Sequence, residues 1–432
     1  MEWIALGLFC AALLICIVLD LSILYALAFG LLVFLLYGRR KGFSRRELFR
    51  MAFEGIKTVR NILITFFLIG IMTALWRAAG TIPLIISMSF DLIRPSIFLL
   101  VTFLLNCGLS VLTGTSFGTA ATMGVICASV GAVMKISPVL TGGAILSGVF
   151  FGDRCSPVST SALLVASLTK TEIYRNIRRM IRSAAVPFVL TCLVYLVLGF
   201  ILPNEGLNID MHPRYVFNRF FNMGPENLIP AAVILLLAFL RVNVKLAMGA
   251  SILSAIPLCL LAQRMPMGEL FRTALSGFSP ADAEVARLVS GGGIVSMIRV
   301  ACIVCLSSAY SGIFQKTGML DEARRLIGRL SAKTGAYAAS LVTSVLTGVI
   351  ACNQTLTILL TEQLCRGEYA DKEALALDLE DSAVVTAPLI PWSIAGAVPL
   401  AAVGAPSAAV LTAFYLILLP LWRLVRGARK TK

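Results

Sequence analysis

Long stretches of this chain contain no charged side chain. Residues 3–18 and 22–36 are two such runs, and in the whole chain of 432 residues 58% are apolar and only 14% charged. A water-soluble domain carries about a quarter charged residues, so these few charges could not cover a water-facing surface of this size. The runs approach the roughly 20 apolar residues with which a helix crosses a bilayer. We therefore expect an all-α, polytopic membrane protein whose partner is the lipid bilayer.

The formal net charge of +15 comes from basic residues that form short clusters between the apolar runs. Cytoplasmic loops of membrane proteins concentrate Lys and Arg in this way. No base-stacking or groove-reading motif accompanies these clusters, so we expect no nucleic-acid partner. The distribution predicts a multi-pass protein of the cell (inner, cytoplasmic) membrane with both termini in the cytoplasm.

Three short motifs occur twice, in the same order. Glu-Leu-Phe-Arg at 47–50 recurs at 269–272, Ser-Val-Leu-Thr-Gly at 110–114 recurs at 344–348, and Ser-Pro at 156–157 corresponds to Ala-Pro at 387–388. Three ordered matches indicate a duplication. The predicted parts are a first repeat over 1–202, an external linker over 203–225 and a second repeat over 226–432.

Equivalent loops of the two repeats differ in basicity. Residues 170–182 hold five basic residues, whereas the corresponding segment 400–411 has no charge. The positive-inside rule places such loops on opposite sides of the membrane. We therefore predict about ten transmembrane helices with two re-entrant or broken elements in an inverted two-fold repeat, an architecture that recurs among secondary transporters.

Four stretches interrupt the apolar pattern at membrane depth. Residues 112–119, 152–161, 347–355 and 381–393 combine Gly or Pro with small hydroxyl or amide side chains. Gly and Pro interrupt helices and free backbone groups, which in lipid must be satisfied internally or line a wet cavity. Paired interruptions at corresponding places in two halves indicate the binding site of a transporter.

The candidate ion- or solute-binding residues come from these four stretches. They are Thr113, Thr115, Ser116, Thr119, Asp153, Ser156, Ser159, Thr160, Asn353, Gln354, Asp381, Thr386, Trp392 and Ser393. Charges at membrane depth are costly and mark function by default, so Asp153 is the leading candidate, unless its neighbour Arg154 neutralises it. Asp381 lies either in the pathway or in a cytoplasmic loop.

Enzyme chemistry finds no support in the sequence. The single histidine, His212, lies in the predicted external linker, so no span offers a histidine base to a nucleophile such as Ser116. The sequence contains neither a metalloprotease His-Glu-x-x-His motif nor a phosphate-binding loop, and its scattered cysteines form no paired zinc motif. We expect a protein that is not an enzyme, has no cofactor and no bound metal, and takes its energy from ion gradients or from the solute itself.

The interrupted stretches resemble a known family. Residues 152–159 resemble the signature Gly-Asp-Lys-x-Ser-Pro-x-Ser of the NhaC-type sodium/proton antiporters, and residues 113–119 resemble that family's Thr-Gly-Thr-Ser-Trp-Gly-Thr. Residues 379–381 and 386–392 are similar to its Leu-Glu-Asp and Thr-Ser-Pro-Leu-Ile-Pro-Trp. The resemblance extends over about 62–399. It implies a cation-coupled secondary antiporter, within a superfamily that also exchanges organic acids such as malate and lactate, and makes a homodimer plausible.

Two departures from the family pattern concern carboxylates. Thr160 stands where the family has Asp, and Asn353 stands in Cys-Asn-Gln where the family shows Gly-Asp-Gln. Exchange of sodium for protons requires a carboxylate for which both ions compete. The sequence thus favours either sodium/proton exchange through the remaining carboxylates or sodium- or proton-coupled exchange of a small organic acid or amino acid. A passive channel is the alternative of another class.

Overall fold

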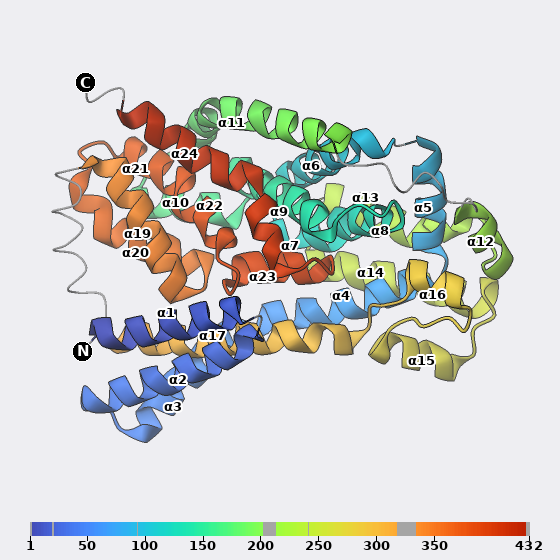
Figure 1. The fold of residues 1–432 in the computed structure, drawn as a ribbon, viewed down its shortest axis with the longest axis horizontal. Coiled ribbons are helices and arrows are strands. Elements are labelled where there is room, and N and C mark those ends of the chain that lie inside the picture. The colour runs from blue at the N-terminus through green and yellow to red at the C-terminus, as the bar shows by residue number, and fades with distance from the viewer. Residues whose placement is uncertain are drawn as a thin grey trace.

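The structure is a computed structural model that describes residues 2–428 apart from 20, 93, 202–212, 241 and 318–333. The model is 84% helical, and the described residues form no strand, which confirms the expected all-α polytopic membrane protein. Most of the long helices run in the same general direction in Figure 1, and both ends of the chain lie on the same side of the bundle.

The helices before residue 202 are α1 (Glu2–Val18), α2 (Ile23–Arg40), α3 (Arg45–Thr58), α4 (Arg60–Ala78), α5 (Thr81–Leu92), α6 (Pro95–Thr113), α7 (Ser116–Thr119), α8 (Val125–Val133), α9 (Pro138–Cys155), α10 (Thr160–Thr169) and α11 (Ile173–Ile201). A π-helical turn, Ala120–Gly124, joins α7 to α8.

The helices after residue 212 are α12 (Pro213–Phe220), α13 (Ile229–Phe239), α14 (Val244–Pro257), α15 (Met267–Ser276), α16 (Ala283–Val289), α17 (Ile294–Thr317), α19 (Ala336–Ala351), α20 (Gln354–Cys365), α21 (Lys372–Asp381), α22 (Ala383–Thr386), α23 (Ile394–Ala402) and α24 (Phe414–Ala428). The linker predicted over 203–225 therefore contains α12, while its residues 203–212 lie outside the described part.

Six helices within the described ranges are long and apolar enough to cross a membrane, or seven if the bent pair 372–389 and 394–402 is one span. That pair bends by 57° at its break. The expected number of about ten spans is reached only with shorter apolar helices such as Thr160–Thr169 and Ala336–Ala351. Their shortness follows from the interruptions, because each break ends one helix and starts another.

Helix contacts in the first half have counterparts in which each helix is replaced by the equivalent helix of the other half. The helix pair α1 and α2 packs together, as does the pair α13 and α14. The contact of α2 with α17 has a counterpart in that of α14 with α4, and the contact of α3 with α17 has one in that of α15 with α4. A two-fold relation between the halves would produce this exchange. The boundaries of the repeats and their inversion across the membrane stay predictions.

The first copy of the repeated Glu-Leu-Phe-Arg motif, at 47–50, lies in α3. The start of α3 is fixed by a capping box, in which Ser44 Oγ accepts from the Glu47 amide at 3.2 Å and the Glu47 carboxylate accepts from the Ser44 amide at 2.8 Å. The apolar face, with Leu48 and Met51, is buried. Gly55 lets α3 approach α17 closely, since a Cβ atom there would stand 2.1 Å from the Ser308 carbonyl oxygen.

The tightest packing near the broken stretches joins α6 to α9. A Cβ atom on Gly152 would lie 2.3 Å from Ser110 Cβ and 2.4 Å from the Val111 nitrogen. Two hydroxyls lock the same contact, because Ser110 Oγ donates to the Val149 carbonyl at 2.5 Å and Ser156 Oγ donates to the Val111 carbonyl at 2.7 Å. Small residues allow close backbone approach between membrane helices, and here that approach holds the end of α9 in place.

Gly152→Ala is expected to destabilise the protein. The added methyl group meets backbone atoms that cannot rotate away, and overpacking of this kind costs about 1–3 kcal/mol. The matched control is Gly108→Ala in α6, where a Cβ atom would meet nothing within 4 Å. Thermal unfolding of the purified protein should show a lower midpoint for Gly152→Ala and no loss for Gly108→Ala. Equal midpoints for the two variants would contradict the packing described.

Candidate functional site

The four interrupted stretches consist of two backbone arrangements, each present twice. In the first, a left-handed residue is followed by an extended one: Gly114 has φ +65° and Thr115 has φ −140°, ψ 118°, while Cys352 has φ +54° and Asn353 has φ −146°, ψ 129°. In the second, an extended serine precedes a new helix, with φ −69°, ψ 137° at Ser159 and φ −71°, ψ 139° at Ser393. The breaks are therefore structural counterparts as well as sequence counterparts.

Each extended residue caps the helix that follows it. Thr115 Oγ1 accepts from the Gly118 amide at 3.2 Å, and Asn353 Oδ1 accepts from the Thr355 amide at 2.9 Å. Ser159 and Ser393 accept in the same way from the amides of residues 161 and 395. Such caps satisfy amide groups that a helix start leaves open. These four candidate residues thus maintain the half-helices on which the site depends.

The breaks lie against one another. Gly114 packs on the backbone of Val158 and Ser159, to which a Cβ atom would come within 2.8–2.9 Å. In the other half, the Ile394 amide donates to the Cys352 carbonyl at 2.8 Å, and Trp392 Nε1 donates to the Val349 carbonyl at 3.2 Å.

One residue links the breaks of the two halves. The Gln354 side chain donates to the Val384 carbonyl at 3.0 Å and also lies close to the Asp153 carboxylate. The predicted meeting of broken helices from both halves is therefore present around Asp153.

Asp153 sits at the end of α9 and is only 3% exposed. Its carboxylate accepts hydrogen bonds from Ser159 Oγ at 2.9 Å and from Ser161 Oγ at 3.0 Å. Within the described ranges no basic side chain forms an ion pair with it. Arg154 does not neutralise Asp153, because its guanidinium forms an ion pair with Asp381 instead.

Arg154 is completely buried, and its donors bind residues of both halves of the chain. It forms an ion pair with Asp381, donates from Nε to the Glu380 carbonyl at 3.2 Å, and donates to Tyr415 Oη at 3.3 Å. Further donors reach Ser183 Oγ and the Met180 carbonyl on α11.

Asp381 is buried at the end of α21, rather than in a loop, and is enclosed by two arginines. Arg423 of α24 approaches it at 2.8 Å and also pairs with Asp378, whose carboxylate accepts from Tyr369 Oη at 2.9 Å. Asp381 therefore belongs to an ion-pair network and has two arginines as counter-charges. Asp153 differs from it, because no basic side chain in the described chain pairs with Asp153.

Glu380 is a site residue that the sequence reasoning passed over. It is completely buried, and neither carboxylate oxygen has a hydrogen-bond partner among the described residues. The charges that act on it are those of Arg154, Asp153 and Asp381. Glu380 is the central residue of the Leu-Glu-Asp motif, which marked this segment of the chain. Nothing in the sequence distinguishes Glu380 from its neighbour Asp381 as a site residue. Asp153 and Glu380 are thus two buried carboxylates in one region, without an ion-pair partner in the described chain.

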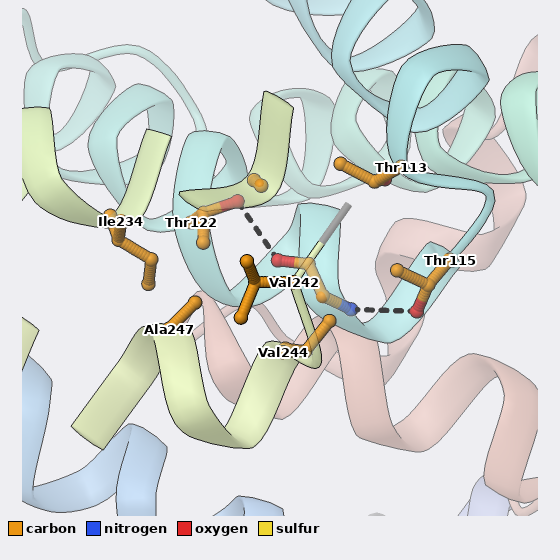
Figure 2. Close-up of a pocket in the computed structure, with 9 residues that line it drawn as sticks. Thr113, Thr115, Thr122, Ile234, Val242, Val244 and Ala247 are labelled. Carbon is orange, nitrogen blue, oxygen red and sulfur yellow. Dashed lines mark hydrogen bonds between the residues drawn. The ribbon is translucent and has the colours of Figure 1, made fainter. Parts of the chain in front are cut away.

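The threonines of the first break form their own group. Thr113 and Thr119 hydroxyls lie 3.1 Å apart, and Thr119 also donates to the Thr115 carbonyl at 2.8 Å. Thr113, Thr115 and Thr122 line a cavity of about 40 Å³ whose opposite wall is formed by apolar side chains of α13, α14 and the connection between them (Figure 2). The cavity has room for one or two water molecules.

The remaining candidates differ in their surroundings. Ser116 is buried, and Thr386 Oγ1 donates to Ser344 Oγ at 3.2 Å. Thr160 is exposed, as is Leu163 one turn along the same helix. The position at which the family resemblance led us to expect an aspartate therefore does not share the buried surroundings of Asp153. No cluster of three or more potential metal ligands (His, Cys, Asp or Glu) occurs in the part of the chain that the structure describes.

Comparison with known proteins places the whole chain in one group. The model of the Na⁺/H⁺ antiporter family matches residues 2–169 and 148–422. The chain is 29% identical to a malate-2H(+)/Na(+)-lactate antiporter of Bacillus subtilis (strain 168), over 90% of this chain and 86% of the relative. It is 26% identical to the Na(+)/H(+) antiporter NhaC of Alkalihalophilus pseudofirmus, over 92% and 88%, and 26% identical to the arginine/ornithine antiporter ArcD of Halobacterium salinarum, over 89% and 82%.

Asp381→Asn is expected to destabilise the folded protein strongly. It leaves Arg154 buried without its counter-charge, and loss of one partner from a buried ion pair costs about 3–5 kcal/mol. Glu373→Gln is the control on the same helix, since Glu373 pairs with the partly exposed Arg175 and Arg179 and such pairs contribute about 0–1 kcal/mol. The measurement is the thermal midpoint and the yield of monodisperse protein. A stable Asp381→Asn variant would show that the network is dispensable.

Proposed function

Because the chain belongs to the Na⁺/H⁺ antiporter family and is a cation-coupled secondary antiporter, we propose that it exchanges Na⁺ for H⁺ at a site formed by Asp153 and Glu380. The observation that carries this proposal is the pair of buried carboxylates that form no ion pair in the described part of the chain. Family membership identifies a transporter, and the cytoplasmic membrane with both termini inside is part of the proposal.

The oxygen atoms around Asp153 suit a small hard cation. Its two carboxylate oxygens, the hydroxyls of Ser159 and Ser161 and the side chain of Gln354 lie within one hydrogen-bonded group. Unwound backbone at paired breaks provides further carbonyl oxygens, as in other transporters that bind Na⁺ or H⁺ at membrane depth. Either ion can neutralise the same carboxylate, which makes their binding mutually exclusive.

Burial explains why one ion must replace the other. An isolated ionised carboxylate in a low-dielectric interior is very costly unless it is paired or protonated. Asp153 and Glu380 have no such pair in the described chain, so departure of Na⁺ requires arrival of a proton. Opening of the broken helices toward one side and then the other would complete the exchange, since alternating access proceeds by movement of one repeat against the other around a fixed site.

A second candidate function is cation-coupled exchange of a small organic acid or amino acid. One relative is named as a malate-2H(+)/Na(+)-lactate antiporter and another as an arginine/ornithine antiporter. Thr160 and Asn353 are neutral where the NhaC-type pattern has carboxylates. The neutral Asn353, which lies at one of the breaks, reduces the negative charge that an organic anion would meet there, and this observation favours the second candidate.

Asp153→Asn is expected to abolish sodium/proton exchange while the protein remains folded. Asparagine keeps hydrogen bonds to Ser159 and Ser161 but cannot take up or release a proton. The assay is proton release from acid-loaded proteoliposomes after a Na⁺ pulse, read with an internal pH dye. Asp371→Asn is the control, because Asp371 is largely exposed, caps α21 and makes one long ion pair with Arg179 at 3.8 Å; asparagine caps as well, and such exposed pairs contribute about 0–1 kcal/mol. Undiminished exchange by Asp153→Asn would remove this residue from the mechanism.

Glu380→Gln is expected to separate stability from transport. It replaces a buried carboxylate that lacks a partner with a neutral side chain, so the thermal midpoint should stay the same or rise, unlike that of Asp381→Asn. Exchange in the proteoliposome assay should fall by at least about a hundredfold, the lower end of what an essential proton-transfer group contributes. A midpoint as low as that of Asp381→Asn would instead assign Glu380 a structural role, and exchange at the normal rate would exclude it from proton coupling.

A further inference from the structure

A second polar cavity lies away from the carboxylates. Its volume is about 400 Å³, and it is bounded by α4, α5, α8, the start of α17 and the end of α23. Pockets that bind small organic molecules begin at about 300 Å³, so this cavity is much larger than an inorganic ion needs. α16, which also contributes to its wall, lies beside α5 and α12 at one end of the molecule in Figure 1.

Arg77 supplies the charge of this cavity. Its Nη1 donates to the Thr73 carbonyl at 2.9 Å, while Nε is buried and has no hydrogen-bond partner among the described residues. Gly291 leaves space beside that nitrogen, since a Cβ atom there would be 3.9 Å from Nε. Among the described residues that line the cavity none is Asp or Glu, so this part of its polar wall has a guanidinium without an acidic partner, together with the hydroxyls of Ser129 and Ser296.

Apolar side chains form much of the remaining wall, to which Thr73 and Ser290 also contribute. Ile82, Val125, Leu288, Met297 and Val403 border the same space. A guanidinium binds carboxylates through two parallel hydrogen bonds, and an apolar wall suits the carbon skeleton attached to a carboxylate. Chloride would leave most of the volume and all of the apolar wall unused. The combination therefore selects a small organic carboxylate.

The cavity is connected to the broken stretches by two helices. The helix that starts after the Thr115 break continues through α8, which provides Val125, Ala128 and Ser129. The helix that Ser393 caps is α23, and its end provides Ala401 and Ala402. At a rise of about 1.5 Å per residue, the cavity lies roughly 12–20 Å from these breaks. It is thus placed at the opposite end of the half-helices from the ion site.

We propose that this cavity binds a small organic carboxylate through Arg77, at one end of the transport pathway. The carboxylate accepts from the free edge of the guanidinium, and the carbon skeleton packs on the apolar wall. The inference rests on the proposed antiport, because only a transporter has a pathway on which the cavity can lie. It also specifies the solute of the second candidate function as an organic anion.

The test uses the full chain, purified and reconstituted in lipid nanodiscs. Thermal midpoints are measured during titration with choline succinate, with choline chloride as the salt control, and separately with NaCl. The variants are Arg77→Gln and the matched control Arg60→Gln, which changes the exposed arginine at the other end of α4. Succinate should raise the midpoint of the unaltered protein and of Arg60→Gln saturably. Arg77→Gln should weaken the apparent Kd for succinate by at least about tenfold.

A second variant, Ala128→Phe, tests the cavity even if Arg77→Gln does not fold. Ala128→Phe keeps the guanidinium but fills the cavity, so it should remove the effect of succinate as well. An equal succinate effect in Arg77→Gln or in Ala128→Phe, or no effect on the unaltered protein, would overturn the proposal. The NaCl titration reports on the ion site alone: it should be unchanged in Arg77→Gln and lost in Asp153→Asn. If NaCl has no effect on the unaltered protein, or the same effect on Asp153→Asn, the proposed sodium site is wrong. The succinate titration tests the anion cavity independently of that result.

Discussion

The ion pair between Arg154 and Asp381 joins the two halves of this protein at the place where their helices break. Burial of a guanidinium in a membrane protein costs several kcal/mol, and the cost is offset only when charge and hydrogen bonds are both satisfied. Arg154 meets these conditions with Asp381, Ser183, Tyr415 and two backbone carbonyls. Since these partners lie on α11, α21 and α24, one side chain fixes the end of α9 against three other helices.

This pairing also decides which carboxylates remain available. Asp153 and Arg154 are neighbours at the end of α9, and Glu380 and Asp381 are neighbours at the end of α21. Successive residues of a helix point about 100° apart, so one member of each pair can face the ion-pair network while the other faces the break. Arg154 and Asp381 take the first position. Asp153 takes the second position and binds Ser159 and Ser161, while the Glu380 carboxylate is buried without a hydrogen-bond partner among the described residues.

The sequence was informative where local chemistry decides the structure. Gly114, Ser159 and Ser393 were found from their residue types, because left-handed residues and helix caps depend on a few adjacent atoms. The pairing of Arg154 with Asp381 joins residues 227 positions apart, and no local pattern contains that information. For the same reason the sequence could not distinguish Glu380 from Asp381. Thr160 is a case in which the sequence pattern pointed to a residue outside the site. The family pattern has an aspartate at this position, yet Thr160 lies on the exposed face of α10.

The proposed anion cavity and the proposed cation site have opposite charges, and this opposition suggests how two solutes could be coupled. A carboxylate leaving Arg77 along α8 and α23 would approach Asp153 and Glu380, whose repulsion in a low-dielectric interior exceeds that in water several-fold. Na⁺ or protons on these two groups would remove that barrier. Each of the two ions would then bind more tightly in the presence of the other, because linkage makes such coupling reciprocal. The electrostatics of two fixed sites would suffice for such coupling, without any contact between the two solutes.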